Sequence, residues 1–86
     1  MPEISRFFGI VIRMYYGDHL PPHFHARYGD DEAVIDIHRL VVIGGRVSPR
    51  ALGMIVEWGA QHRQELLDLW ELAADGQPLH EIAPLE

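Results

Sequence analysis

The first half of the chain alternates between apolar and polar residues, a pattern that predicts β-strands. β-Branched and aromatic residues dominate four such segments, which are residues 5–16, 23–28, 33–40 and 41–47. Gly9 marks a bulge or a bend within the first segment, and Gly44-Gly45 either interrupts the fourth or forms a two-residue hairpin turn. Because the connections between the segments are short, we expect an antiparallel meander over residues 1–47.

The pattern changes at Ser48-Pro49, where an N-cap residue precedes a proline at the first helical position. No residue breaks a helix outright before Gly76 and Pro78 end it, so we predict one helix over residues 48–75. At about 1.5 Å per residue this helix would be about 39 Å long, whereas a domain of this size has a radius of gyration of about 12 Å. We therefore expect the helix to bend, near Gly59, or to project past the sheet.

These elements predict one α+β domain over residues 1–86. Its small, twisted, mostly antiparallel sheet has three to four strands, one long C-terminal helix packs on one face, and residues 76–86 form a tail. A chain of 86 residues supports one modest core, and its folding buries only about 60% of the surface that the unfolded chain exposes. A partner subunit would therefore add stability.

The predicted helix carries more apolar surface than one contact with a sheet needs. At about 100° per residue, one apolar arc faces the sheet and a second strip lies at its flank. The flank strip consists of Met54, Trp58, Leu69 and Leu72. Either the tail covers it, with Leu79, Ile82 and Leu85, or a second chain binds it, since exposed apolar patches often mark interfaces. We predict the flank strip as the partner-binding surface, for a homodimer or for a second small protein.

Composition narrows the classes of function. The net charge of −6 at pH 7 disfavours nucleic acid as a partner without excluding it. The chain has no cysteine, which excludes disulfides, thiolate chemistry and cysteine-ligated zinc. No apolar stretch approaches the roughly 20 residues that span a bilayer, and the N-terminus lacks the pattern of a signal peptide. We therefore expect a cytoplasmic protein that does not associate with membranes.

Candidate chemistry concentrates in residues 18–28, where three of the six histidines lie around Pro21-Pro22. A period of two places His23, His25 and Arg27 on one face of a strand, opposite Phe24 and Ala26. The same period in the flanking strands adds four residues to this face, namely Arg13, Tyr15, Asp36 and His38. We expect these side chains to gather on the sheet face that the helix leaves open, although a single bulge would invert part of the pattern.

Three interpretations of this face stay open. In the first, it is a metal site that holds a transition metal such as zinc or nickel. Its candidate ligands are His19, His23, His25, Asp36 and His38. In the second, it is a metal-free acid–base site, in which imidazoles move a proton and guanidinium groups stabilise an anion. Its candidate residues are His23, His25, Arg13 and Arg27. In the third, the histidines belong to a solvated sheet face and carry no chemistry.

Several segments resemble a known family. They are residues 1–16, Asp18-His19, Pro21-Pro22-His23-Phe24-His25-Ala26-Arg27-Tyr28-Gly29, Arg50-Ala51-Leu52, Glu57-Trp58, residues 62–67, and Trp70 with Gly76, Pro78 and Leu79. Across nearly its whole length the chain is similar to domain-of-unknown-function family 4160, a group of small bacterial and archaeal proteins. The resemblance implies no activity, cofactor or catalytic residue.

The genes of this family often resemble one half of a two-gene unit, an arrangement similar to toxin–antitoxin modules, and this implies a protein partner. The main interpretation is therefore a protein-interaction component of a two-gene, toxin–antitoxin-like module. The alternatives are a small RNase-like hydrolase and a transition-metal-binding protein, both of which would use the histidine and arginine face. Whether the protein is an enzyme stays open.

Overall fold

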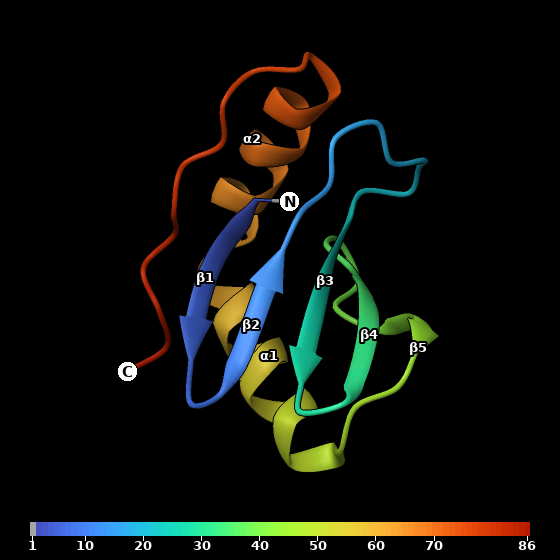
Figure 1. The fold of residues 1–86 in the computed structure, drawn as a ribbon, viewed down its shortest axis with the longest axis vertical. Coiled ribbons are helices and arrows are strands. Elements are labelled where there is room, and N and C mark those ends of the chain that lie inside the picture. The colour runs from blue at the N-terminus through green and yellow to red at the C-terminus, as the bar shows by residue number, and fades with distance from the viewer. Residues whose placement is uncertain (1) are drawn as a thin grey trace.

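The computed structural model describes residues 2–86, which form five strands followed by two helices (Figure 1). The strands are β1 (Glu3–Phe7), β2 (Ile10–Arg13), β3 (His23–Tyr28), β4 (Asp31–Asp36) and β5 (Val42–Gly45), and the helices are α1 (Pro49–Gln61) and α2 (Arg63–Ala74). The strands lie in the sheet in chain order, and every neighbouring pair is antiparallel. The predicted α+β class and antiparallel sheet are confirmed, whereas the predicted strand number and single helix are wrong.

The additional strand arises in residues 5–16, where we expected one strand with a bulge or bend at Gly9. The chain instead reverses at Phe8 and Gly9, whose φ angles are 50° and 81°. Two consecutive residues with positive φ are typical of the type I′ hairpin turn, which matches the twist of the flanking strands. Phe7 and Ile10 therefore face each other across a hairpin of β1 and β2.

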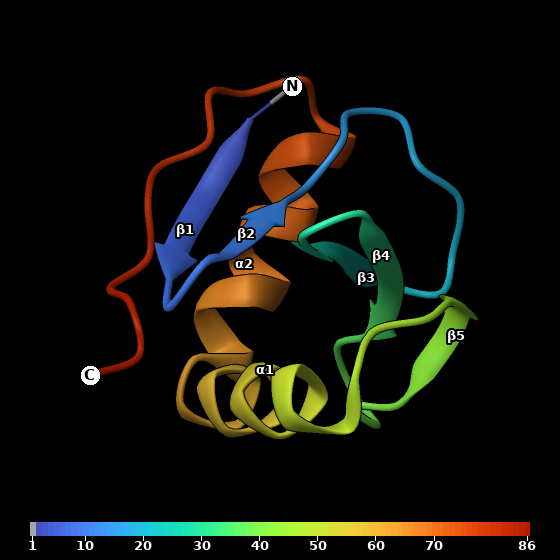
Figure 2. The same ribbon diagram turned by 60° about the horizontal axis from the view of Figure 1, so that its bottom comes forward.

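The predicted single helix is broken at His62. This residue has φ −123° and ψ 23°, which lies outside helical geometry, and its ring nitrogen Nδ1 lies 2.7 Å from Glu65 Oε1 in the first turn of α2. Figure 2 shows that α1 and α2 run in different directions beneath the sheet. The change of direction lets both helices pack within a body whose radius of gyration is 11.6 Å. The break thus replaces the bend that we expected near Gly59.

The core lies between the sheet and the two helices. Phe24 and Ala26 of β3 are fully buried, as the alternation along this strand predicts. Trp58 of α1 lies at the centre, with its ring centroid 5.4 Å from that of Phe7 and 5.7 Å from that of Phe24. Gly59 is buried beside Trp58, where a Cβ atom would lie 2.8 Å from Leu40 Cδ2. Glycine therefore permits a close approach between α1 and the turn after β4.

The C-terminal tail runs along the outer side of β1 (Figure 1). The backbone N–H of Ile82 donates to the carbonyl of Ile4 at 2.7 Å, and Trp58 Nε1 donates to the carbonyl of Ala83 at 2.8 Å. Ile82 and Leu85 are both buried in the core. The tail thus covers the free edge of β1 and the indole of Trp58.

The packing of the tail and the core buries part of the flank strip, the predicted partner-binding surface. Trp58 and Leu69 are 0% exposed and belong to the core, so the partner contact that we expected through them would require the tail or the core to move. Met54 and Leu72 are partly buried and pack against the core cluster. Partner binding through these two residues stays a prediction. Neither described helix is long and apolar enough to cross a membrane.

Candidate functional site

The connection between β2 and β3 folds back over the start of β3 and is held at both ends. The hydroxyl of Tyr16 donates to the carbonyl of Gln77 at 3.0 Å, which ties the loop to the end of α2. On the other side, the backbone N–H of Ile37 donates to the carbonyl of Pro22 at 3.0 Å. These anchors position Asp18, which lies between them in the chain, against the side chains of β3.

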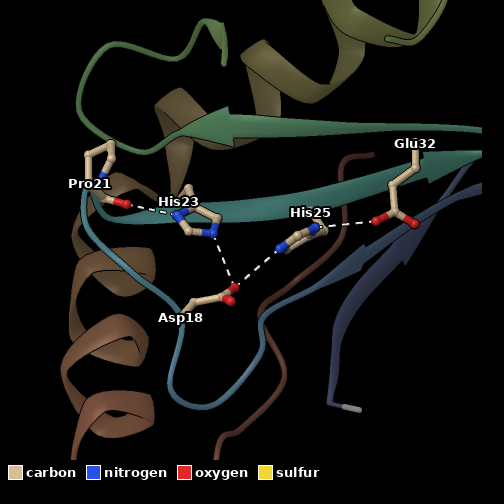
Figure 3. A network of polar contacts seen from close by, with 5 residues as sticks. All are labelled: Asp18, Pro21, His23, His25 and Glu32. Carbon is tan, nitrogen blue, oxygen red and sulfur yellow. Dashed lines mark hydrogen bonds and ion pairs between the residues drawn. The ribbon is translucent and has the colours of Figure 1, made fainter. Parts of the chain in front are cut away.

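One oxygen of Asp18 meets two histidines (Figure 3). Asp18 Oδ2 lies 3.1 Å from His23 Nε2 and 3.2 Å from His25 Nε2. The second nitrogen of each ring also faces oxygen: His23 Nδ1 lies 2.7 Å from the carbonyl of Pro21, and His25 Nδ1 lies 3.2 Å from Glu32 Oε2. All four ring nitrogens therefore point at oxygen atoms, and three of the four contacts are with carboxylate oxygens.

The chemistry of these contacts limits where the protons lie. A carbonyl oxygen only accepts, so His23 Nδ1 carries a proton, and in an uncharged ring His23 Nε2 then turns a lone pair toward Asp18. His25 faces a carboxylate at both nitrogens, and one uncharged ring supplies one N–H. Two uncharged rings thus offer two protons to four contacts. With both rings uncharged, two of the four contacts therefore lack a proton, and the contact of His23 Nε2 with Asp18 Oδ2 is one of them.

Aromatic rings enclose the two imidazoles. The ring of Tyr15 lies edge-on to His25 with a centroid distance of 4.3 Å, and the ring of Trp70 on α2 lies 5.1 Å from that of His23. The side chains of His23, His25 and Asp18 are 12%, 17% and 30% exposed. Asp18 also lines a small cleft, together with Tyr15, Gly17, Trp70, Ala73 and Ala74. The two histidine side chains are thus largely enclosed but keep a small exposed fraction.

The structure gathers part of the predicted metal set and adds a residue that we missed. Within residues 2–86, Asp18, His23 and His25 form the one group of three or more histidine or acidic side chains whose ligand atoms all lie within 4.8 Å of one another. His19 and His38, which we expected as further ligands, are exposed outside this group.

Asp36, the remaining predicted ligand, contacts Arg39 rather than the histidine group. It pairs with His23 in the β3–β4 register, but its carboxylate accepts from the backbone N–H of Arg39 at 2.9 Å and from the Arg39 guanidinium at 3.3 Å. The bond from the Arg39 backbone, together with the guanidinium, holds the pKa of Asp36 below its usual range, although burial opposes the shift. Asp36 therefore stabilises the turn that follows β4.

The two predicted catalytic arginines differ in position. Arg13 lies directly opposite His25 in the β2–β3 register and is partly buried. Arg27 is exposed, and its Nε donates to the carbonyl of Gly29 in the β3–β4 turn at 3.1 Å. Of the two predicted arginines, Arg13 is thus the one whose backbone position lies beside His25.

The comparisons with known proteins give a family and no activity. The model of one family, described as a domain of unknown function (DUF4160), matches residues 9–71, which include Asp18, His23, His25 and Glu32. This match confirms the resemblance seen in the sequence. No curated protein and no solved structure matched the chain.

Proposed function

The chain belongs to the DUF4160 family, whose description names no activity, and we propose that it is a transition-metal-binding protein with Asp18, His23 and His25 as ligands. The observation that carries the proposal is the convergence of two Nε2 atoms on one carboxylate oxygen, while both Nδ1 atoms face separate acceptors. A cation between Asp18 and the Nε2 atoms leaves each ring uncharged, with its single proton on Nδ1. All four contacts are then favourable.

The distances fit a first coordination shell. Zinc binds histidine nitrogen and carboxylate oxygen at about 2.0–2.2 Å, so two such ligands at a tetrahedral angle lie about 3.4 Å apart. The observed separations of 3.1 and 3.2 Å between Asp18 Oδ2 and the two Nε2 atoms are close to this value. Imidazole and carboxylate ligands suit zinc or nickel, which are the metals that we expect.

The groups that surround the two histidines are also those expected around metal-bound histidines. Histidines that bind a metal usually donate their other ring N–H to a backbone carbonyl or a carboxylate, which fixes the tautomer and the orientation of the ring. Pro21 supplies such a carbonyl to His23, and Glu32 supplies such a carboxylate to His25. The site thus contains ligands and their supporting acceptors together.

Three protein ligands are the number found in catalytic zinc sites, which keep a position for water or substrate. A metal ion there would supply Lewis-acid chemistry or an activated water. Arg13, opposite His25 in the register, would bind an anionic group beside it. A small hydrolase that acts on phosphodiesters, such as an RNase-like enzyme, is therefore the enzymatic form of this proposal.

Calorimetric titration of chelator-treated protein with zinc or nickel tests the proposal. We expect one ion per chain and a loss of affinity of at least about 100-fold in Asp18→Ala, His23→Ala and His25→Ala, since removal of even a supporting residue costs about 10–100-fold. His19→Ala and His38→Ala are matched controls, because both histidines are exposed outside the ligand group. Wild-type protein that binds neither metal at micromolar concentration would contradict the proposal.

A second candidate function, a protein-interaction component of a two-gene, toxin–antitoxin-like module, is favoured by exposed apolar side chains. Phe8, Leu20, Val41 and Ile43 are all at least 40% exposed on a chain of 86 residues. Co-expression with the product of the adjacent gene, followed by measurement of the mass in solution, tests this role. We expect a stable heterocomplex, and a chain that stays monomeric beside that product at micromolar concentration would exclude it.

A further inference from the structure

The sheet ends at β5 with two apolar side chains in solvent. Val41 and Ile43 are 43% and 40% exposed. The ladder between β4 and β5 pairs Val34 with Gly44 and Ile35 with Val42, so Ile43 lies in a bulge without a partner of its own. Bulges and short edge strands discourage the addition of a further strand. A partner at this edge would therefore contact side chains rather than extend the sheet.

The same region carries a local positive charge on an acidic protein. Residues 37–56 contain Arg39, Arg46 and Arg50 and none of the thirteen acidic residues. Arg39 is paired with the buried Asp36 but remains 66% exposed, while Arg46 is exposed and forms no ion pair within residues 2–86. Along the chain, arginines thus flank the two exposed apolar residues on both sides. We call Val41, Ile43, Arg39 and Arg46 the β5 patch.

The opposite edge of the sheet, at β1, is covered by the C-terminal tail. The tail covers β1 through the Ile82–Ile4 hydrogen bond, and Glu3 pairs with Arg6 at 2.8 Å on the strand itself. Of the two edge strands, β5 thus carries an exposed large apolar side chain, Ile43, and β1 carries none.

We propose that the β5 patch binds an acidic segment of a partner protein, which places apolar side chains on Val41 and Ile43 and carboxylates on Arg39 and Arg46. This inference rests on the interaction role proposed above and involves none of the three proposed metal ligands. Charge complementarity selects the occupant, because arginine pairs well with carboxylates and like charges across an interface are costly. A second copy that used the same patch would bring arginines against arginines.

Selection from a display library of short random peptides on the immobilised full chain tests the inference. We expect enrichment of peptides that combine aspartate or glutamate with large apolar residues, and weaker binding at higher salt. Fluorescence anisotropy of the selected peptides should show at least a tenfold loss of affinity in Val41→Ser/Ile43→Ser and in Arg46→Glu. Phe8→Ser and Arg6→Ala are the matched controls, since both residues are exposed on the β1–β2 hairpin.

The outcomes separate this inference from the function on which it rests. Enrichment of basic or uncharged peptides would overturn the inference. So would acidic peptides whose affinity is unchanged by the β5 substitutions. A heterocomplex with the adjacent gene's product that persists in both β5 variants would also overturn it and leave the interaction role standing. If the wild-type protein forms no heterocomplex at all, both the interaction role and the β5 inference are contradicted. Circular dichroism of each variant checks that these surface substitutions leave the fold intact.

Discussion

The carboxylate of Asp18 lies 3.1 Å from Nε2 of His23, and the same oxygen reaches His25 at 3.2 Å. His23 follows Asp18 by five positions in the chain, and the loop between them returns to β3. This contact turns a pair of histidines on a strand into a group of three converging side chains. Its consequences extend to the residues that hold the histidines in place.

Glu32 is expected to tune the metal site without binding the ion. Its Oε2 lies 3.2 Å from Nδ1 of His25, so with the proton on Nδ1, as proposed, Glu32→Ala removes the acceptor that orients the ring. We expect the zinc affinity of this variant to fall by about 10–100-fold, with one ion still bound per chain. Titration calorimetry measures both quantities. Asp31→Ala, at the adjacent position of β4, is the control, and equal affinities for all three proteins would contradict the role of Glu32.

Asp36 is expected to make stability depend on pH in the acid range. Its pKa is lowered from the ordinary value of 3.8, chiefly by the backbone N–H of Arg39, so the folded state binds the proton less readily than the unfolded state. The stabilisation is therefore fully present above pH 3.8 and is lost as the pH falls through the lower pKa of the folded state.

Urea unfolding of wild type and Asp36→Asn in the presence of a chelator checks this dependence. At neutral pH we expect the free energy of unfolding to be about 1.5–3 kcal/mol lower in the variant, because hydrogen bonds to a charged group are lost. The difference should shrink on acidification below the ordinary pKa of aspartate. A difference that stays constant down to the acid limit of folding would show that the charge of Asp36 is not responsible.

Two glycines of α1 are expected to respond in different ways to alanine. Gly53 is exposed and a Cβ atom there has no neighbour within 4 Å, so Gly53→Ala should stabilise the protein by about 1 kcal/mol through helix propensity. At Gly59 the same gain is opposed by the contact with Leu40 Cδ2, since overpacking costs about 1–3 kcal/mol. Thermal unfolding should place Gly53→Ala above wild type and Gly59→Ala below Gly53→Ala. Equal melting temperatures for the two variants would contradict the packing at Gly59.

The tail is expected to contribute to the core. Ile82 is 3% exposed, and its backbone is bound to β1, so Ile82→Ala should lower the free energy of unfolding by about 2–5 kcal/mol. The neighbouring Glu81→Ala changes an exposed side chain and serves as the control. Trp58 lies under the tail, so tryptophan fluorescence of Ile82→Ala should shift to the red if the tail detaches. Identical stability of both variants would mean that the tail does not pack in solution.

The sequence predicted the elements whose pattern is local. The alternation in β3 identifies its buried face because the side-chain period of a strand is two. The sequence pattern did not predict the β1–β2 hairpin, because its turn is Phe8-Gly9 and phenylalanine is an unusual residue at positive φ. The break at His62 was not predicted because neither glycine nor proline occupies that position.

The candidate site was predictable only where it depends on a local sequence pattern. His23 and His25 follow from the period of β3, whereas Asp18 depends on a loop fixed by distant contacts, from Tyr16 to Gln77 and from Pro22 to Ile37. The sequence signal for Asp18 is a carboxylate in the loop directly before a His-x-His strand. His38 was assigned to the histidine face by extending the period of β4 past Asp36, where the strand ends and a turn begins.

In the proposed site a metal ion binds Nε2 of both histidines while Nδ1 keeps the proton. Long-range proton–nitrogen NMR correlations of the two imidazole rings, recorded with and without one equivalent of zinc, measure this directly. We expect that zinc leaves both rings protonated at Nδ1 and shifts both Nε2 resonances to the range of metal-bound nitrogen. Ring spectra that do not change with zinc, or rings protonated at Nε2 in its presence, would contradict metal binding by the two histidines.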